Sequence, residues 1–497
     1  MEKSLWQKDN NLKNMESIDK NITTDTLIVG AGITGVSIAY NLINSKNKVV
    51  LIEQGKCCNG VTSKSTGKLT YLQDLVYSKI DKMYGFDFAR LYYESQKDAI
   101  KTVKKIVKDN NIDCDLKKCE AITFTSDKNE VKKFQDEKNI LDKFGVNYSS
   151  SSKNIDDTKI KEIISVKNTY VFNPVKYVKS LIKLIKNSNN IIIYENSMAK
   201  AVRKEEGYFI TKVNNFEIKS KKIVFACNYP FFILPGLIPL KTYLEKSYIT
   251  ATKVDKTFDI SGINSNYPTI SFRFHEEKDS KYFIYLSNSS KICDKLNYNK
   301  NYDTCIKEAK KITGKAPYYK WTNMDAMTND HIPLIGRISN DESNAFIATG
   351  YNTWGMTNGV IAGKVIYDLL TNKKNKYINL FDPSRDINFK KILNFMSNTL
   401  FSNIKAYGLN LIKKNPSWYK EKAMVTKLNG KRVGIYYDKD GNSHVVSNIC
   451  PHFKCFLTFN ETDKTWDCPC HGSRFDIYGN VVKGPSVNDI KIDETKF

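Results

Sequence analysis

The stretch DTLIVGAGITGVSIAYNLINSKNKVVLIE, residues 25–53, has the pattern of a nucleotide-binding unit. A short apolar run at 25–30 precedes a glycine-rich turn and apolar residues at helical spacing over 36–45. A second apolar run, 48–53, ends in an acidic residue. This order predicts a strand, a turn, a helix and a second parallel strand, which together begin an α/β Rossmann-like domain.

Four residues of this stretch are suited to holding a dinucleotide. Gly30 permits the tight turn after the first strand, Gly32 lets the backbone approach a pyrophosphate, and Gly35 allows the helix to pack closely. Glu53 lies where a carboxylate can bind the ribose hydroxyls of an adenosine. The glycine motif alone is weak evidence, because a turn before a helix can match it by chance. The two strands, the helix and the acidic residue together make the prediction specific.

Segments far downstream extend this layout. Residues 222–227 and 345–350 have buried-strand patterns, YNTWGMTNG at 351–359 indicates a glycine-bearing turn, and 360–370 indicates a helix. This order resembles the D-amino-acid oxidase and glycine oxidase superfamily, which binds FAD. The sequence has no second Gly-x-Gly-x-x-Gly, so a layout with a separate NAD(P)H site is not supported. The resemblance implies flavin contacts from Gly350, Gly355, Met356 and Thr357.

A small polar loop, CCNGVTSKSTGK at 57–68, directly follows the second strand. In the superfamily that this chain resembles, the equivalent loop runs beside the flavin. The alternative is an ordinary Ser/Gly turn. A covalent flavin link through Cys57 or Cys58 is less favoured than a buried, structural role for these thiols. The candidates for flavin contact are Gly60, Ser63, Ser65, Thr66 and Lys68, and Lys68 is also a catalytic candidate.

The middle of the chain predicts an antiparallel substrate domain. Residues 269–275 and 282–286 form two strand patterns separated by a short polar turn. Arg273 is a candidate for binding a substrate carboxylate, and the alternative is a surface arginine on a strand. His275 and His331 are each isolated, for which a structural role is favoured over a catalytic one. His331 precedes a segment that lies near the flavin in the resembled family, so it is the better catalytic candidate of the two.

Two short loops near the C-terminus bring together Cys and His residues at metal-ligand spacing. Cys450 and His452 form the first pair, and Cys468 and His471 form the second. Two Cys and two His also suit tetrahedral zinc. However, zinc fingers usually take their Cys ligands from one loop and their His ligands from the other, whereas here each loop supplies one of each.

The stretches CPHFKC and CPCHGSRFD resemble the Rieske family, in which one iron of a [2Fe-2S] cluster takes two Cys and the other two His. The resemblance assigns Cys450 and Cys468 to one iron and His452 and His471 to the other. It also implies a disulfide between Cys455 and Cys470. Strand patterns with Asn-Gly and Asp-Gly turns surround these loops and predict an all-β unit.

The net charge is +24 over 497 residues. The lysines are dispersed rather than clustered with aromatics, which favours a solvated surface over a nucleic-acid site. Residues 387–413 have amphipathic helical spacing, for which we prefer a connector between domains to a membrane-surface helix. The sequence has no apolar run long enough to span a membrane and no secretory signal pattern. We therefore expect a cytoplasmic protein.

The predicted organisation is an N-terminal tail (1–24), an FAD-dependent oxidoreductase domain (25–385), a helical connector (386–419) and a Rieske domain (420–497). The same combination is known from bacterial oxidoreductases. It implies an enzyme that passes electrons between a small organic substrate, of the amine or amino-acid class, and an external one-electron partner through FAD and the cluster. Flow in the reverse direction is equally compatible. The alternative is a redox or iron–sulfur sensor that does not turn over a small molecule.

Overall fold

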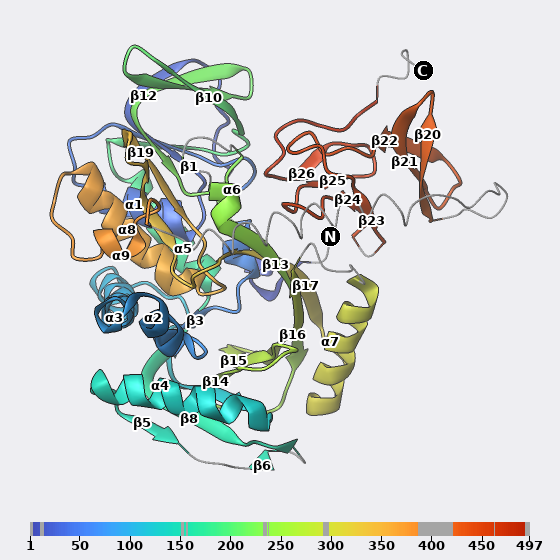
Figure 1. The fold of residues 1–497 in the computed structure, drawn as a ribbon. Coiled ribbons are helices and arrows are strands. Elements are labelled where there is room, and N and C mark those ends of the chain that lie inside the picture. The colour runs from blue at the N-terminus through green and yellow to red at the C-terminus, as the bar shows by residue number, and fades with distance from the viewer. Residues whose placement is uncertain are drawn as a thin grey trace.

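The computed structural model describes residues 3–9, 14–150, 154–155, 158–231, 236, 238–291, 298–385, 421–461 and 463–492. Figure 1 shows two large sheets with their helices, and a smaller β-rich unit to one side. The connector helix predicted at 387–413 lies outside the described residues.

The first large sheet is the predicted nucleotide-binding sheet. Its central strand β1 pairs in parallel with β2 on one side and with β12 on the other, and β12 pairs in parallel with β19. All four residues of β2 are buried, as expected for a parallel strand that is covered on both faces. The strands are β1 (Ile22–Val29), β2 (Val49–Ile52), β9 (Ile191–Tyr194), β10 (Ala199–Glu205), β11 (Tyr208–Val213), β12 (Phe216–Phe225), β18 (Leu334–Ser339) and β19 (Glu342–Thr349).

Helices α1 (Ile33–Asn41), α5 (Pro174–Lys186) and α8 (Gly355–Leu370) contribute to the apolar core beside this sheet. The sequence predicted that the last of these helices begins at residue 360, after a turn, but it begins at Gly355. Positions 359 and 363 lie inside this helix and are glycines because α1 passes directly over them. A Cβ atom at Gly359 would lie 2.8 Å from Ile33 Cγ2, and one at Gly363 would lie 2.7 Å from Ser37 Cβ.

The second large sheet is mostly antiparallel, in agreement with the predicted substrate domain. The predicted hairpin is formed by β15 and β16. β15 begins and ends two residues later than the sequence pattern suggested, and β16 is longer than its pattern. In sheet order the strands are β17 (Tyr319–Thr328), β13 (Thr242–Lys253), β16 (Ser280–Lys291), β15 (Ser271–Glu277), β14 (Ile260–Asn264), β4 (Lys117–Thr125), β8 (Glu162–Val171) and β3 (Lys68–Leu69), with β5 (Tyr148–Ser150) beside β8.

The remaining helices lie around these two sheets (Figure 1). The pair α2 and α3 buries tyrosines beneath the nucleotide-binding unit, and Tyr77 and Tyr92 are fully buried. The α-helices are α2 (Val76–Tyr84), α3 (Phe86–Asp109), α4 (Val131–Lys143), α6 (Ile238–Lys241), α7 (Tyr298–Thr313) and α9 (Ile378–Phe381), and the 3-10 helices are η1 (Leu5–Asp9), η2 (Val61–Lys64) and η3 (Lys128–Glu130).

The C-terminal unit is built from two small antiparallel sheets. Trp466 lies between them and is fully buried. It contacts β21 at Gly434, where a Cβ atom would lie 2.5 Å from the indole ring, so a larger residue there would push the sheets apart. The strands are β20 (Ala423–Leu428), β21 (Lys431–Tyr437) and β22 (Ser443–Ser447) in one sheet, and β23 (Thr458–Asn460), β24 (Thr465–Asp467), β25 (Arg474–Phe475) and β26 (Val481–Lys483) in the other.

Candidate functional site

The glycine-rich turn has the backbone that a dinucleotide pyrophosphate requires. Gly30 has φ +106°, and a Cβ atom there would lie 2.8 Å from the Ala226 carbonyl oxygen. A Cβ atom at Gly35 would lie 1.9 Å from the Gly30 carbonyl oxygen. Gly32 is the N-cap residue of α1, where helix N–H groups are available to an anion. The donor set and the shape of this turn therefore fit the pyrophosphate of FAD.

Glu53 follows β2 beside this turn. Its Oε2 accepts a hydrogen bond from the Ala31 N–H at 2.9 Å, and its Oε1 accepts one from the Gly55 N–H at 3.2 Å. Burial raises the pKa of the Glu53 carboxyl group, while these N–H donors act to lower it. The structure thus brings the acidic residue to the glycine turn, as a ribose-binding role requires.

The polar loop at 57–68 lies beside both the turn and α8. Ser63 is fully buried and Ser65 Oγ accepts the Gly67 N–H at 3.1 Å. Thr62 was not singled out by the sequence, yet its Oγ1 accepts the Ile33 N–H at 3.0 Å at the start of α1. The spacing of small polar residues could have suggested it, but the contact itself depends on the fold.

A cavity of about 80 Å³, open to solvent on one side, lies between this loop, the second sheet and the start of α8. Its lining includes Lys68 together with Glu245 and Asp325, so it offers both charges. Burial raises the pKa of Asp325 to about 7. The lining includes Ser65, Thr66, Gly355 and Met356 of the sequence candidates, and Lys64, Ser247, Ser271, Asn323 and Trp354, which the sequence did not indicate.

Lys68 is the best-placed titratable group of this cavity. Its Nζ donates to Ser271 Oγ at 2.5 Å and to the Gly262 carbonyl oxygen at 3.2 Å, and lies 5.4 Å from the centre of the Trp354 ring. Burial lowers the pKa of Lys68 to about 7. Near neutral pH this amine can therefore hold or release a proton.

Arg273 does not line the cavity, contrary to the substrate role that we considered. It is fully buried, and its Nη1 donates to the carbonyl oxygens of Thr66, Gly67 and Phe172 at 2.8 to 3.0 Å. Its Nη2 lies 3.2 Å from His275 Nδ1. The guanidinium is thus directed at the backbone of the polar loop, which suits a positioning role.

The remaining candidates from the sequence, Gly350, Thr357 and His331, lie outside the lining of the cavity. Gly350 follows β19 with φ +73°, where a Cβ atom would lie 2.5 Å from Thr328 Cγ2. Thr357 is buried, and its Oγ1 accepts a hydrogen bond from Gln73 Nε2 at 3.1 Å. His331 has φ +66° and lies half-buried between β17 and β18, outside the residues that line the cavity.

The two C-terminal loops converge as their spacing predicted. The His452 and His471 rings meet edge to face with centroids 5.1 Å apart. Both nitrogens of His452 and the Nδ1 of His471 are buried without a hydrogen-bond partner among the described residues. Burial lowers the pKa of His452 to about 4 and that of His471 to about 3, so both rings are neutral, which is the form that binds metals.

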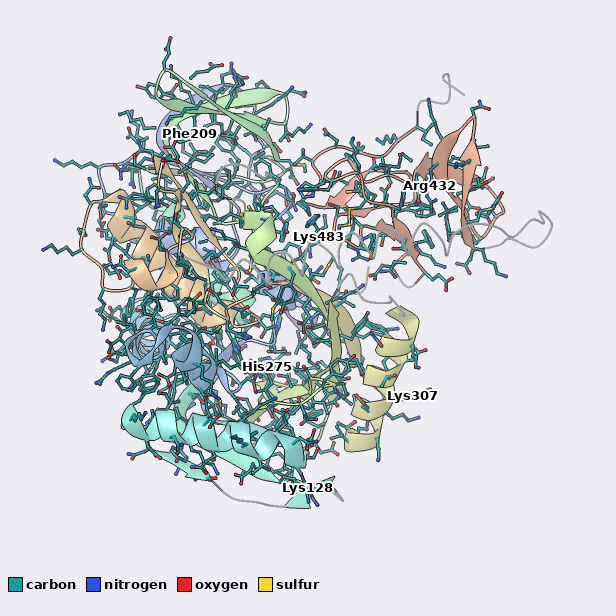
Figure 2. The ribbon with its side chains drawn as sticks, in the orientation of Figure 1. Lys128, Phe209, His275, Lys307, Arg432 and Lys483 are labelled. Atoms are coloured by element: carbon teal, nitrogen blue, oxygen red, sulfur yellow. A yellow bond between two sulfur atoms is a disulfide. The ribbon has the colours of Figure 1, made fainter. Side chains whose placement is uncertain are left out.

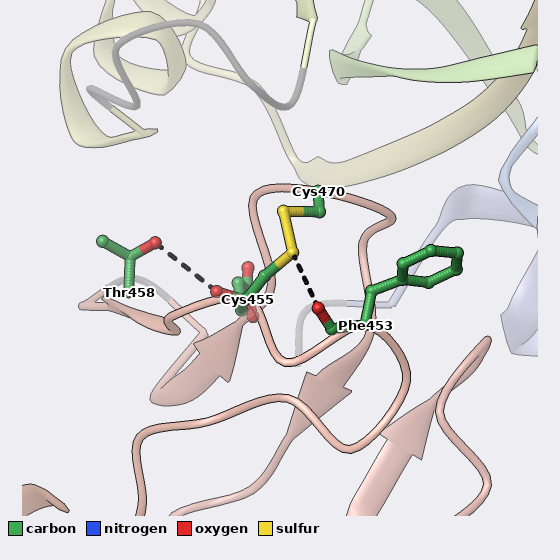
Figure 3. Close-up of a disulfide and its surroundings, with 5 residues drawn as sticks. Phe453, Cys455, Thr458 and Cys470 are labelled. Atoms are coloured by element: carbon green, nitrogen blue, oxygen red, sulfur yellow. Dashed lines mark hydrogen bonds between the residues drawn. A yellow bond between two sulfur atoms is a disulfide. The ribbon is translucent and has the colours of Figure 1, made fainter. Parts of the chain in front are cut away.

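The cysteines complete this donor set. The buried thiols of Cys450 and Cys468 interact, which lowers the pKa of Cys450 to about 7. A disulfide joins Cys455 to Cys470, and Figure 3 shows it linking the two loops, with Cys455 Sγ 3.8 Å from the Phe453 carbonyl oxygen. The sulfurs of Cys455, Cys468 and Cys470 lie within 4.8 Å of one another. Two thiols and two orphaned imidazoles fit a Rieske cluster.

This centre faces the larger unit. His471 packs against Tyr229, which follows β12, with ring centroids 5.6 Å apart. Lys483 lies at the same boundary (Figure 2) and interacts electrostatically with Lys64 and Asp325, two residues that line the cavity. The residues suited to hold the cluster and the residues that line the cavity therefore both lie near the interface between the C-terminal unit and the larger unit.

Residues 25–369 match the family described as FAD dependent oxidoreductase, DAO. The chain belongs to this family. Residues 412–493 match the Rieske [2Fe-2S] domain, and the two matches together show an FAD-dependent oxidoreductase with a Rieske centre. The resemblance drawn from the sequence is confirmed, as are FAD and the [2Fe-2S] cluster as cofactors.

Known relatives of this DAO-family chain match either its whole length or its flavin domain. A Bacillus subtilis (strain 168) protein named as a Rieske 2Fe-2S iron-sulfur protein, YhfW, is 30% identical over 98% of this chain and 97% of its own. Gamma-glutamylputrescine oxidoreductase of Escherichia coli (strain K12) is 21% identical over 73% of this chain and 87% of its own.

Solved structures show the same fold in the DAO domain. Glycine oxidase from Geobacillus kaustophilus superposes with a TM-score of 0.61 at 14% identity, covering 74% of this chain and all of its own. L-proline dehydrogenase from P. horikoshii has a TM-score of 0.60 at 18% identity, covering 76% of this chain and 99% of its own. Within the described part of the chain, no helix is long and apolar enough to cross a membrane.

Proposed function

We propose that this protein oxidises a small substrate of the amine or amino-acid class in the cavity beside Lys68, and that the electrons leave through the Rieske cluster to an external acceptor. The named activities of structural neighbours, which include glycine oxidase, L-amino acid deaminase and L-proline dehydrogenase, support the substrate class.

The cofactors supply the redox chemistry: FAD takes two electrons with a hydride, and the cluster carries one electron at a time. The chain holds them through separate residue sets. Gly30, Gly32, Gly35 and Glu53 are suited to the dinucleotide, and the start of α8 to the ring system. Cys450, Cys468, His452 and His471 are suited to the cluster.

The cavity residues have roles that follow from their positions. Lys68 Nζ lies in a buried site with a pKa of about 7, so at neutral pH it can accept a proton from a substrate ammonium group. Trp354 and Met356 cover this part of the cavity with apolar surface, which limits the access of water. Asp325 and Glu245 lie among the cavity residues as acceptors for a substrate N–H.

The observation that carries the proposal is the contact between His471 and Tyr229. A ligand of the cluster touches the domain that contains the flavin site, and both residues are less than one-tenth exposed. Such a dry contact is expected where two redox sites in one chain exchange electrons. A sensor without turnover would not need a cavity lined by titratable groups beside this contact.

The test is anaerobic addition of glycine, L-proline and putrescine, one at a time, to the oxidised full-length protein. Absorbance follows the flavin, and low-temperature EPR follows the cluster. We expect at least one compound to bleach the flavin and then to generate the EPR signal of the reduced cluster, which an added one-electron acceptor removes. Flavin reduction that never reaches the cluster would contradict the electron path. Full loading of both cofactors without turnover of an extended panel of amines and amino acids would support a sensor.

A further inference from the structure

The backbone of the polar loop is held by side chains from distant parts of the chain. Five successive carbonyl oxygens, at residues 63–67, each accept a side-chain hydrogen bond. Ser4 Oγ donates to Ser63 at 2.5 Å, Trp321 Nε1 to Lys64 at 2.9 Å, Trp6 Nε1 to Ser65 at 2.7 Å, and Arg273 Nη1 to Thr66 at 3.0 Å and Gly67 at 2.8 Å.

Two of these donors come from the N-terminal segment, which the sequence suggested to be a tail. Leu5 and Trp6 are fully buried in the same apolar core as the nucleotide-binding sheet. The Trp6 ring meets His275 edge to face at 4.7 Å, and the Arg273 guanidinium lies 5.4 Å from its centre. Outside the core, Lys8 forms an ion pair with Glu277. The segment is therefore built into the domain.

The loop that this segment holds reaches two parts of the flavin site. At its start, the Thr62 hydroxyl accepts the Ile33 N–H at the N-terminus of α1. Further along, Ser65, Thr66 and Lys68 line the cavity beside the start of α8. A shift of the loop would change both ends together, because only the hydrogen-bonded residues 63–67 separate Thr62 from Lys68.

We propose that Ser4 and Trp6 are positioning residues for FAD: the N-terminal segment fixes the 63–67 carbonyls and so presents the other face of the loop to the cofactor. The inference rests on FAD binding, which the family establishes, and is independent of the proposed substrate. The hydrogen bonds from Ser4 and Trp6 each join a neutral donor to a backbone carbonyl. Removing either donor leaves an unpaired acceptor beside the cofactor site.

The test compares FAD binding by the full-length apoprotein of three variants with that of the unaltered protein. Trp6→Phe removes the N–H but keeps an aromatic ring against Arg273. Ser4→Ala removes one hydroxyl. Trp466→Phe is the matched control, because its Nε1 has no hydrogen-bond partner among the described residues and it lies in the Rieske domain. Flavin fluorescence quenching gives the dissociation constant, and the visible absorption band of the bound flavin reports its surroundings.

We expect Trp6→Phe and Ser4→Ala each to weaken FAD binding by about tenfold, the size of one buried hydrogen bond, and to shift the flavin band. Any fall in the melting temperature of the apoprotein should be no greater than in Trp466→Phe, which also loses a buried indole but should bind FAD normally. The EPR signal of the cluster should remain unchanged in the Ser4 and Trp6 variants. Unchanged FAD affinity, or a loss of affinity that merely follows a loss of apoprotein stability, would overturn the proposal. If Trp6→Phe does not fold, Ser4→Ala decides by the same criteria.

Discussion

His471 lies against Tyr229 across the boundary between the Rieske and flavin domains, with ring centroids 5.6 Å apart. Tyr229 is held from behind, because its hydroxyl donates to the Pro239 carbonyl oxygen at 3.3 Å. Burial raises the pKa of this phenol, so the hydroxyl stays protonated at physiological pH. The ring is thus a fixed, uncharged surface for the cluster loop.

Replacement of this ring should separate the two redox sites without removing either cofactor. In Tyr229→Ala the domains lose an aromatic contact of about 1 kcal/mol, which lowers the equilibrium constant for their docking by about fivefold. We expect slower reduction of the cluster after rapid reduction of the flavin, measured by anaerobic stopped-flow absorbance. Tyr229→Phe keeps the ring and loses only the hydrogen bond to Pro239, so its rate should stay much closer to that of the unaltered protein than the rate of the Ala variant does. If the cluster is reduced as fast in the Ala variant as in the unaltered protein, electron exchange does not use this contact.

Lys68 should give substrate oxidation a characteristic pH dependence. Burial lowers its pKa to about 7, so it is protonated below this pH and free to accept a proton above it. The rate of flavin reduction should therefore rise as the pH increases through about 7. Lys68→Met should remove this step and reduce the rate by about 100-fold or more, the usual contribution of a general base. A profile that keeps its step near pH 7 in the variant would assign the proton acceptor elsewhere.

Arg385 and Asp330 should stabilise the end of the flavin domain. Arg385 Nε and Nη2 lie 2.8 and 3.0 Å from the two carboxylate oxygens of Asp330, and both side chains are buried. Burial acts to raise the pKa of Asp330, but Arg385 outweighs it and the net shift is downward. The pair therefore stabilises the fold at neutral pH, and this stabilisation is lost as the pH falls through the lowered pKa of Asp330.

Arg385→Met leaves the buried carboxylate without its cation and should destabilise the domain by about 3 to 5 kcal/mol. This loss is measured by chemical denaturation, with the release of flavin as the signal that is monitored. The control is Lys315→Met, which breaks an exposed ion pair with Asp255 and should change little. An equally small effect in both variants would mean that Asp330 finds another partner.

The parts of the fold that local pattern determines were predictable. The glycine turn between β1 and α1 is specified by Gly30 and Gly35, since their neighbours leave no room for a Cβ atom. The cluster loops were equally predictable, because His452 and His471 stand beside cysteines within a few residues of sequence. Both predictions needed only short-range spacing.

The features that the sequence did not reveal depend on contacts between distant segments. Trp6 appeared to be part of a tail because its partners lie at Ser65 and Arg273. Arg273 has the charge of a carboxylate-binding residue, but the sequence could not show that backbone carbonyls take its donors. The start of α8 was placed too late because the glycines in YNTWGMTNG indicate a turn, whereas Gly359 lies inside the helix and lets α8 pack against α1.

Metal analysis with low-temperature EPR on anaerobically prepared, dithionite-reduced protein tests directly whether the chain holds both cofactors. We expect a flavin spectrum, two irons per chain and the signal of a reduced Rieske cluster. His452→Ala and His471→Ala should abolish that signal, whereas His444→Ala, which changes a histidine that pairs with Asp438 away from the cluster loops, should keep it. Zinc in place of iron, or a cluster signal that survives loss of His452 or His471, would show that these two histidines do not hold a Rieske cluster.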